Sequence, residues 1–380
     1  MNLLEYEGKS LLAQWGIPIP KGIHVVSPQE AVEAFNYMGA SAVLKIQVPI
    51  GGRGKAGGVK IVNSEDEVET FFDTWNEKEF KGYSISGILV QEDVHIESEA
   101  YISITINSGS GNMLLMFCPE GGMDIEEIAQ KRPESLLKME LEAGRQYREF
   151  HFRIALSQLG MENTKLIHMS KIAHKLYKCF VDNDLCLAEI NPLVIKEDGE
   201  VLALDAKIEV DDSALFRNKG FNSVKREIKD VFEREAKDIG VTYVKLEGNI
   251  GIIASGAGLA MNTMDIISQT GYQAANFLET GGGITSTLMS RTLQLIVKNE
   301  SVKAVIVNLY GGVNPLVEAA KGLVDGLNSL EKKIPIIVKA LGNQQEECWS
   351  ILEQANIPVI KNHRTEDAVK QIIKLLEDDN

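Results

Sequence analysis

The sequence predicts an α+β region followed by an α/β domain with a doubly wound, open parallel sheet. From residue 247 to 380, five strand patterns alternate with helix patterns, as in β-α units on a parallel sheet. Residues 1–240 instead mix hairpin signals with amphipathic helices. Because 380 residues exceed the size at which a single hydrophobic core usually divides, we expect the two regions to be separate domains.

The composition argues against several classes of function. A formal net charge of −15 disfavours non-specific binding to nucleic acids or anionic membranes. No apolar run approaches the roughly 20 residues that a membrane span needs, and the acidic, amphipathic start is unlike a signal peptide. The four cysteines have no Cys-x-x-Cys spacing, which fits a reducing compartment. We therefore expect a soluble, cytoplasmic protein.

Most elements of the first region follow from hydrophobic periodicity. Helices are expected over residues 3–15, 64–75, 145–160 and 165–181, and strands over 88–92, 101–107 and 113–118. A charge-rich stretch over about 213–243 has a helical pattern, and we interpret it as an exposed helical connector between the two domains.

A glycine-rich segment over residues 51–58 lies between predicted strands at 43–48 and 59–62. Five of its eight residues are glycine, and the others include Arg53 and Lys55. The segment has the letters of a dinucleotide fingerprint, but a strand follows where that fingerprint requires a helix. It also lacks the Lys-Ser/Thr pair of a Walker A loop. A flap that folds over nucleotide phosphates remains, with a mobile surface hairpin tip as the alternative.

Residues 185–209 predict a β-hairpin, because two runs rich in Leu and β-branched residues flank a turn. A two-residue Asp-Gly turn would pair Asn191 with Ala206. A three-residue loop over 197–199, with its glycine in the left-handed conformation, would instead pair Asn191 with Asp205.

We favour the three-residue loop, because it gathers Glu189, Asn191, Asp205 and Lys207 on one face of the hairpin. An amide oxygen beside a carboxylate suits a Mg²⁺ ion that is held partly by nucleotide phosphates. An ordinary hairpin with a hydrated edge would carry the same pattern.

In the second region, glycine-rich loops follow three strands directly. Strands are expected over residues 249–254, 274–278, 302–309, 334–340 and 357–360, each followed by a helix. The loops 255–258, 279–283 and 310–314 lie at the edge where open parallel sheets bind ligands. Asn314 and Pro315 suit the cap and the first residue of a helix, so the amides of Gly312–Asn314 are predicted to form an anion site.

Several motifs stand in order along the whole chain. They are Gly51–Lys60, Glu189–Val194, Ser213–Arg217, Gly256–Met261, Asn276–Leu278, Gly281–Gly283 and Gly311–Gly312. On these motifs the chain resembles the β subunits of the ADP-forming succinyl-CoA synthetase family. The resemblance implies an ATP-grasp nucleotide-binding region over about 1–240 and a flavodoxin-like CoA-ligase domain over 247–380.

The resemblance also implies a reversible reaction. ATP, a small carboxylic acid and CoA would give an acyl-CoA, ADP and phosphate, with succinate as the simplest acid. The phosphoryl group would pass through a histidine of a partner α subunit, which would also bind most of the CoA. The six histidines of this chain agree with that expectation, because none of them lies in a glycine-rich loop.

By the same resemblance, individual residues acquire expected roles. The nucleotide phosphates would be held by Lys45, Gly52, Arg53 and Gly54, and the ribose by Glu99. Asn191 and Asp205 would bind Mg²⁺, and Glu189 would steady the partner's phosphohistidine. The acid or the phosphate would contact Ser255, Gly312, Val313 and Asn314.

The chain departs from the family pattern at the nucleotide hinge, where Gln91 replaces a Glu and Val94 a Thr, and in its C-terminal loops. Ser255 replaces an Asn, Glu279 and Thr280 replace Asp-Val, and Asn314 and Pro315 replace a pair that ends in Arg. These changes bear on which carboxylate is bound, because an arginine clamp and an asparagine helix cap are different anion environments. A ligase for malate or another small carboxylate is therefore the alternative within the family.

Outside the family, two other functions remain open. Gly256-x-Gly258 follows a strand, and Glu279 lies about 20 residues further on, as in a nicotinamide-dependent oxidoreductase. Met261 at the third glycine position speaks against that function. A non-catalytic partner that kept the fold is the other alternative, but the retained cationic and metal-type residues speak against it.

Overall fold

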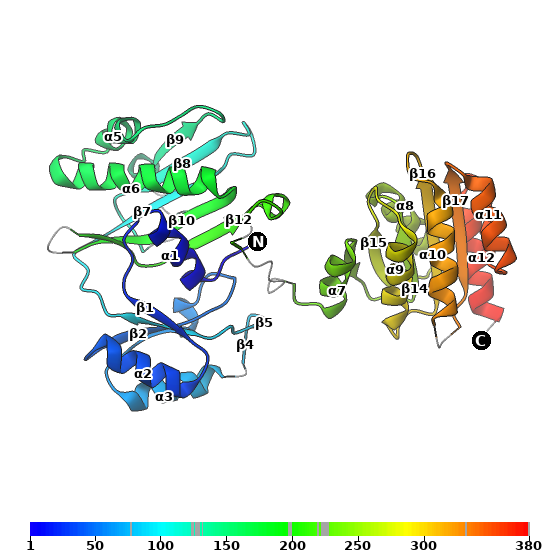
Figure 1. Cartoon of the computed structure of the whole chain (residues 1–380), viewed down its shortest axis with the longest axis horizontal. Coiled ribbons are helices and arrows are strands. Elements are labelled where there is room, and N and C mark those ends of the chain that lie inside the picture. Colours follow the sequence, from blue (N-terminus) through cyan, green and yellow to red (C-terminus); the bar gives the residue numbers. More distant parts are fainter. Residues whose placement is uncertain are drawn as a thin grey trace. The chain divides into compact units, whose positions relative to one another are not determined.

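The computed structural model describes residues 1–380 except 77, 123–124, 126–129, 131, 197–199, 219, 222–227, 331–332 and 379–380. The chain divides into two compact units, Met1–Glu227 and Ile228–Asn380 (Figure 1). Each unit is described by itself below. The predicted hairpin loop 197–199 lies outside the described residues.

The first unit begins with a four-stranded antiparallel sheet in the order β1-β6-β2-β3. Its strands are β1 (Gly22–Val25), β2 (Ala42–Ile46), β3 (Val59–Val62) and β6 (Ile88–Glu92), and its helices are α2 (Pro28–Met38) and α3 (Glu65–Trp75). Ser27 and Ser64 cap the two helices by accepting hydrogen bonds from backbone amides of the first turn. A separate short hairpin joins β4 (Glu79–Phe80) to β5 (Tyr83–Ser84).

The predicted glycine-rich segment is the connection between β2 and β3. These two strands pair antiparallel from Ala42↔Val62 to Lys45↔Val59, as the sequence indicated. A single 3₁₀ turn, Gly54–Ala56, is the regular structure within the connection. The loop therefore projects from the end of a paired hairpin, next to Lys45.

A larger mixed core follows in the same unit. The sheet has the order β11-β10-β7-β8-β9, and β12 also pairs with β10. Its strands are β7 (Ser98–Ile106), β8 (Met113–Cys118), β9 (Leu137–Leu141), β10 (Leu185–Ile195), β11 (Val201–Ala203) and β12 (Lys207–Val210). Helices α1 (Glu5–Gln14), α5 (Glu149–Ser157) and α6 (Asn163–Asp182) pack against it, and α6 lies along the sheet in Figure 1.

The register of the long strand β10 agrees with the favoured form of the predicted hairpin. Leu193 pairs with Ala203 on β11, and Glu189 pairs with Lys207 on β12. Both pairs belong to one register, in which position 191 stands opposite position 205 and not 206. One long strand thus pairs with two short ones, and the interruption falls at the predicted metal residues.

The second unit is a flavodoxin-like sheet. Its strands are β13 (Thr242–Lys245), β14 (Ile250–Ala254), β15 (Asn276–Glu279), β16 (Ala304–Gly311), β17 (Ile336–Gly342) and β18 (Val359–Ile360). The order is β13-β15-β14-β16-β17-β18, and all pairs are parallel except β13 with β15. The five parallel strands thus run second, first, third, fourth, fifth, which is the flavodoxin order. The predicted fold class is confirmed.

Helices cover both faces of this sheet. On one face α8 (Ala257–Ser268) and α12 (Thr365–Asp378) bury apolar side chains against Ile250, Ile252 and Ile337. On the other face, the buried cluster contains side chains of α9 (Ser286–Lys298), α10 (Leu316–Asn328) and α11 (Gln345–Gln354). The glycine-rich loops meet at the carboxyl edge between these layers.

In the described residues of the predicted helical connector over 213–243, helix is confined to two short elements. Its described part holds a 3₁₀ turn at Asp212–Ala214 and the helix α7 at Val231–Ile239, while 219 and 222–227 lie outside the described residues. Ala236 and Ile239 of α7 are buried in the core of the second unit. The prediction of an exposed segment was wrong for α7, because its many charged residues lie on one face and its other face is apolar and buried.

All four cysteines are free thiols, three of them buried, as their spacing indicated. Within the described residues, no helix combines the length and the apolar character needed to cross a bilayer.

Candidate functional site

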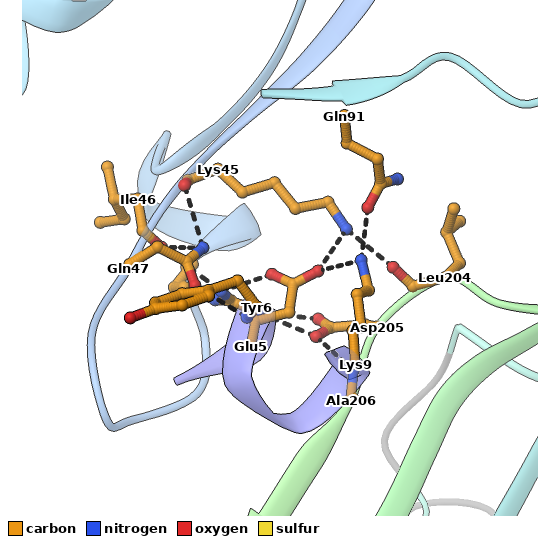
Figure 2. A network of polar contacts seen from close by, with 11 residues as sticks. Glu5, Tyr6, Lys9, Lys45, Ile46, Gln47, Gln91, Leu204, Asp205 and Ala206 are labelled. Carbon is orange, nitrogen blue, oxygen red and sulfur yellow. Dashed lines mark hydrogen bonds and ion pairs between the residues drawn. The ribbon is translucent and has the colours of Figure 1, made fainter. Parts of the chain in front are cut away.

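Lys45 lies beside the carboxylate of Glu5 at the end of the β2–β3 hairpin (Figure 2). Arg53, from the loop that joins these strands, contacts the carboxylates of Glu5 and Asp205. Lys45 Nζ is 2.8 Å from Glu5 Oε1 and donates a hydrogen bond to Leu204 O at 2.9 Å. Arg53 is 2.6 Å from Glu5 Oε2. It also donates to both carboxylate oxygens of Asp205, at 3.0 and 2.9 Å. One guanidinium thus connects the first helix to the predicted metal residue.

A second lysine completes this group. Lys9 Nζ lies 2.5 Å from Glu5 Oε1 and donates to Gln91 Oε1 on β6. We call this group the ion cluster, and it consists of Glu5, Lys9, Lys45, Arg53 and Asp205. Its three cations exceed its two carboxylates, so the formal net charge is +1. An anion near the cluster would find one positive charge that is not offset.

Burial and the neighbouring charges of the ion cluster shift the pKa values of its members. Burial alone would raise the pKa of Glu5, but Lys45, Lys9 and Arg53 together hold it well below the ordinary value. Burial, followed by repulsion from Lys45, lowers the pKa of Lys9 to about 8. Burial opposes the charge of Arg53, yet Asp205 and Glu5 raise its pKa. Glu5 is therefore ionised and Arg53 protonated at neutral pH.

A cavity of about 790 Å³ opens beside the ion cluster. Every residue predicted to hold nucleotide or metal lines it, namely Lys45, Gly52, Arg53, Gly54, Glu99, Asn191 and Asp205. Its lining also has an apolar part, made by Val43, Val59, Ile61, Val94, Ile96, Pro192 and Leu204. Cations and apolar side chains around one cavity suit a ligand that is anionic at one end and flat and apolar at the other.

Glu189 lines an adjoining cavity of about 210 Å³, which shares Arg53, Asn191 and Asp205 with the larger one. The Tyr101 hydroxyl lies 3.5 Å from Glu189 Oε2. Burial and then the charge of Glu189 raise the pKa of Tyr101, so this hydroxyl remains a donor. A third cavity, of about 350 Å³ near Met1, contains none of the predicted site residues.

Asn191 and Asp205 present oxygen atoms that fit a hard cation. Asn191 Oδ1 accepts a hydrogen bond from Gly122 N at 2.9 Å, and Asp205 Oδ1 accepts one from Ala206 N at 2.7 Å. No group of three or more His, Cys, Asp or Glu side chains suited to a metal occurs among the described residues. A cation here would need phosphate oxygens and water to complete its shell, which is the usual situation of Mg²⁺.

Gly122 brings Asn191 and Glu99 to the same wall of the cavity. Its φ angle of +71° is left-handed, and a Cβ atom at this position would lie 2.1 Å from Glu99 Oε2. Only a residue without a side chain allows this approach.

In the second unit, the predicted acid-binding residues lie at the carboxyl edge of the sheet. Ser255 follows β14, and Gly312, Val313 and Asn314 follow the neighbouring strand β16. The two loops are joined, because Tyr310 N donates to Ser255 Oγ at 2.8 Å. Val313 is 92% exposed, and space beside Gly312 is open.

One detail of that edge corrects the sequence prediction. Pro315 occupies the N-cap of α10 and the helix begins at Leu316, whereas Asn314 was predicted as the cap and Pro315 as the first helical residue. The neighbouring loop explains the shift, because Leu316 N donates to Asn343 O at 3.0 Å. The predicted anion site therefore has no capping asparagine side chain.

Glu279 and Thr280, which also differ from the family pattern, form hydrogen bonds within the second unit. The carboxylate of Glu279 accepts hydrogen bonds from Gly281 N at 2.9 Å and from Thr242 Oγ1 at 3.0 Å. Thr280 is buried, and its amide donates to Ala254 O at 2.9 Å. Glu279 is thus engaged within the unit, which gives no support to a nicotinamide ribose site.

The burial of three charged residues, Glu5, Lys9 and Lys339, was not predicted from the sequence. Glu5 and Lys9 are four residues apart on an amphipathic helix, a spacing that normally indicates an exposed ion pair. Lys339 is buried on β17, donates to Asn308 Oδ1 at 3.3 Å, and has its pKa lowered by burial. A single lysine inside the apolar run 336–340 was the available signal for it.

Comparison with known proteins agrees with this arrangement. The ATP-grasp domain family model matches residues 2–195, and the CoA-ligase model matches residues 253–373. The chain is 37% identical over 375 residues to the succinate–CoA ligase [ADP-forming] subunit beta of Ignicoccus hospitalis, covering 99% of both chains. It is 38% identical over 386 residues to the same-named protein of Pseudomonas aeruginosa, covering 99% of this chain and 100% of that one.

A solved structure supports the fold independently. ATP citrate lyase from Methanothrix soehngenii, determined with citrate and coenzyme A, superposes with a TM-score of 0.75. The match covers 98% of this chain and 99% of the other at 17% sequence identity, so it bears on the fold alone. Taken with the full-length relatives and both family models, the chain belongs to the family of ADP-forming succinate–CoA ligase β subunits.

Proposed function

We propose that this chain is the nucleotide-binding β subunit of an acid–CoA ligase. The reaction converts ATP, succinate and CoA into ADP, phosphate and succinyl-CoA. The observation that supports it best is the cavity of about 790 Å³, in which the ion cluster lies beside an apolar lining. Triphosphate and base have the two chemistries that such a cavity accommodates.

The residues of the cavity then have separate tasks. Lys45 and Arg53, with the amides of the glycine-rich loop, bind the phosphates of the nucleotide. Glu99 accepts hydrogen bonds from the ribose hydroxyls. Asn191 and Asp205 hold Mg²⁺, which would offset phosphate charge during transfer.

The phosphoryl group leaves this chain for a histidine of a partner subunit. No histidine among the described residues lines either of the two adjoining cavities. Glu189, in the smaller cavity, would accept a hydrogen bond from the partner's imidazole and so orient it. The partner α subunit also supplies most of the CoA site, and the pair works as a hetero-oligomer, for which we propose the cytoplasm as location.

A related acid is the alternative substrate. Ser255 Oγ accepts a hydrogen bond from Tyr310 N, and Pro315 stands at the start of α10 in place of an arginine. Without the planar arginine fork, a carboxylate at this edge would be bound by backbone amides and hydroxyls. Such a site suits a hydroxylated acid such as malate better than an arginine clamp would.

The test uses the complex of this chain with its α subunit. ADP production from ATP is measured with CoA and with succinate, malate, glutarate or itaconate in turn. We expect turnover only when CoA and an acid are both present, with succinate most active. If malate supported turnover and succinate did not, malate would be the substrate in place of succinate. ADP formation that ignores CoA, or no turnover with any acid, would refute the ligase.

A further inference from the structure

Glu5 is a buried carboxylate that the proposed mechanism does not use. It is the first residue of helix α1, and its side chain is 1% exposed. Its two oxygens contact three cations, Lys9 at 2.5 Å, Lys45 at 2.8 Å and Arg53 at 2.6 Å. Figure 2 shows the ammonium groups of Lys45 and Lys9 converging on one oxygen of Glu5. A carboxylate so buried needs compensating charge, and these cations provide it, although Glu5 Oε2 accepts no hydrogen bond from the described residues.

Glu5 stands behind the phosphate-binding residues and not beside the ligand. Lys45 and Arg53 line the larger cavity, whereas Glu5 is absent from its lining and reaches only the smaller one. The two cations come from different places, one from strand β2 and one from the glycine-rich loop. Glu5 is the group that both of them contact, one through each oxygen.

Without an anion between them, these cations would repel one another. In a poorly hydrated site, opposite charges at close range attract strongly and like charges repel strongly. Lys and Arg side chains are also flexible, so each must be restrained before it can meet a phosphate in a fixed position. A carboxylate that holds one cation on each oxygen provides both the screening and the restraint.

We propose that Glu5 is a positioning residue for nucleotide binding. It holds the ammonium of Lys45 and the guanidinium of Arg53 at a fixed spacing, so that the triphosphate meets two cations already in place. The proposal deepens the proposed function, because it rests on that cavity binding a nucleotide. Glu5 itself does not touch the substrate.

The experiment replaces Glu5 in the assembled αβ complex. For Glu5→Gln we expect the KM for ATP to rise about 30-fold, with the KM values for acid and CoA within twofold of wild type. Glu5→Asp keeps the charge one methylene further back, and should raise the KM for ATP about fivefold. Glu7→Gln is the matched control on the same helix, because Glu7 accepts from Leu4 N at the helix start. It should leave the KM for ATP unchanged.

Direct binding separates this proposal from the proposed function. The dissociation constant of a non-hydrolysable ATP analogue with Mg²⁺ is measured for wild type and for the Glu5 variants, together with the melting temperature. Weaker analogue binding by Glu5→Asp, at an unchanged melting temperature, would support positioning even if no acid gave turnover. Equal KM increases for all three substrates, or an unchanged dissociation constant in both variants, would overturn it.

Discussion

The two units place positive charge at their candidate sites in different ways. In the first unit, Glu5 and Asp205 hold three cations by ion pairs of 2.5 to 2.9 Å. In the second unit, the loops 255–258, 279–283 and 310–314 contain no lysine or arginine. The buried cation of its sheet, Lys339, donates to the amide oxygen of Asn308 at 3.3 Å. The first site depends on the identity of a few side chains, whereas the second depends on backbone geometry.

The departures from the family pattern fall in both units, at Gln91 and Val94 in the first and in the loops at the sheet edge in the second. Ser255, Thr280 and Pro315 lie in loops of the second unit that are held partly by backbone amides, such as those of Thr280 and Leu316. The Ser255 hydroxyl also takes part, because it accepts a hydrogen bond from Tyr310 N. A backbone amide remains when the side chain changes, so such loops tolerate substitution and can alter the acid that is bound. The ion cluster offers no such freedom, because each member is the partner of another.

Loss of Arg53 would break the first site most severely. Arg53→Met removes the contact of Nη2 with both oxygens of Asp205, the contact of Nη1 with Glu5 and a proposed phosphate ligand. We expect kcat/KM for ATP to fall about 1,000-fold, which is about 4 kcal/mol. Steady-state kinetics at saturating acid and CoA measure it. Arg53→Lys is the control that keeps charge without the fork, and a fall below tenfold for Arg53→Met would contradict the comparison.

Asp205 tests the metal assignment with a smaller effect. Asp205→Asn keeps the shape but removes the charge, so Mg²⁺-dependent turnover should fall about 100-fold while the fold stays intact. Titration of activity against Mg²⁺ gives the measurement, and far-ultraviolet circular dichroism provides the control. Activity equal to wild type at low Mg²⁺ would remove Asp205 from the metal site.

Ser255 tests the tolerance of the second unit. Ser255→Asn restores the family residue in a loop held by Tyr310 N. We expect kcat/KM for succinate relative to malate to rise about tenfold, while the KM for ATP changes by less than twofold. Competition between the two acids provides the most sensitive comparison. If the ratio moved by less than twofold, Ser255 would have no part in acid selection.

The last prediction concerns stability. The folded-state pKa of Lys9, about 8, lies below the ordinary 10.5, so between these values the unfolded chain binds the additional proton. Stability contributed by this residue therefore rises with pH across that window. The free energy of unfolding, from urea titrations at pH 7.5 and 10, should increase more for wild type than for Lys9→Met. Parallel changes in the two proteins would show that Lys9 titrates normally.

Regular patterns made much of the fold predictable. The alternation after residue 247 gave the parallel sheet, and the strands Val59–Val62 and Ile88–Glu92 coincide with their predicted bounds. Asn191 and Asp205 were placed opposite each other correctly because the hairpin register follows from the alternation of side chains, which permits few choices.

Features that depend on contacts between residues distant in sequence could not be predicted from the sequence. Glu5 and Lys9 have the spacing of a solvent-exposed pair, and their burial comes from β2 and β6, distant in sequence. The cap of α10 shifted by one residue because Asn343, from another loop, accepts the Leu316 amide. The chain between the units was mistaken for a longer helix because charge pattern alone does not reveal which face is covered.

The contact between Arg53 and Asp205 has a consequence for the order of assembly. The guanidinium proposed for phosphate is paired with the carboxylate proposed for the metal. A metal ion that arrives alone must compete with a guanidinium, and a nucleotide that arrives alone must compete with a carboxylate. The metal–nucleotide complex offers Arg53 a phosphate and Asp205 a cation at the same time, which compensates for the loss of the ion pair between them. If the proposed roles hold, the cleft would therefore bind the metal–nucleotide chelate in preference to either free component.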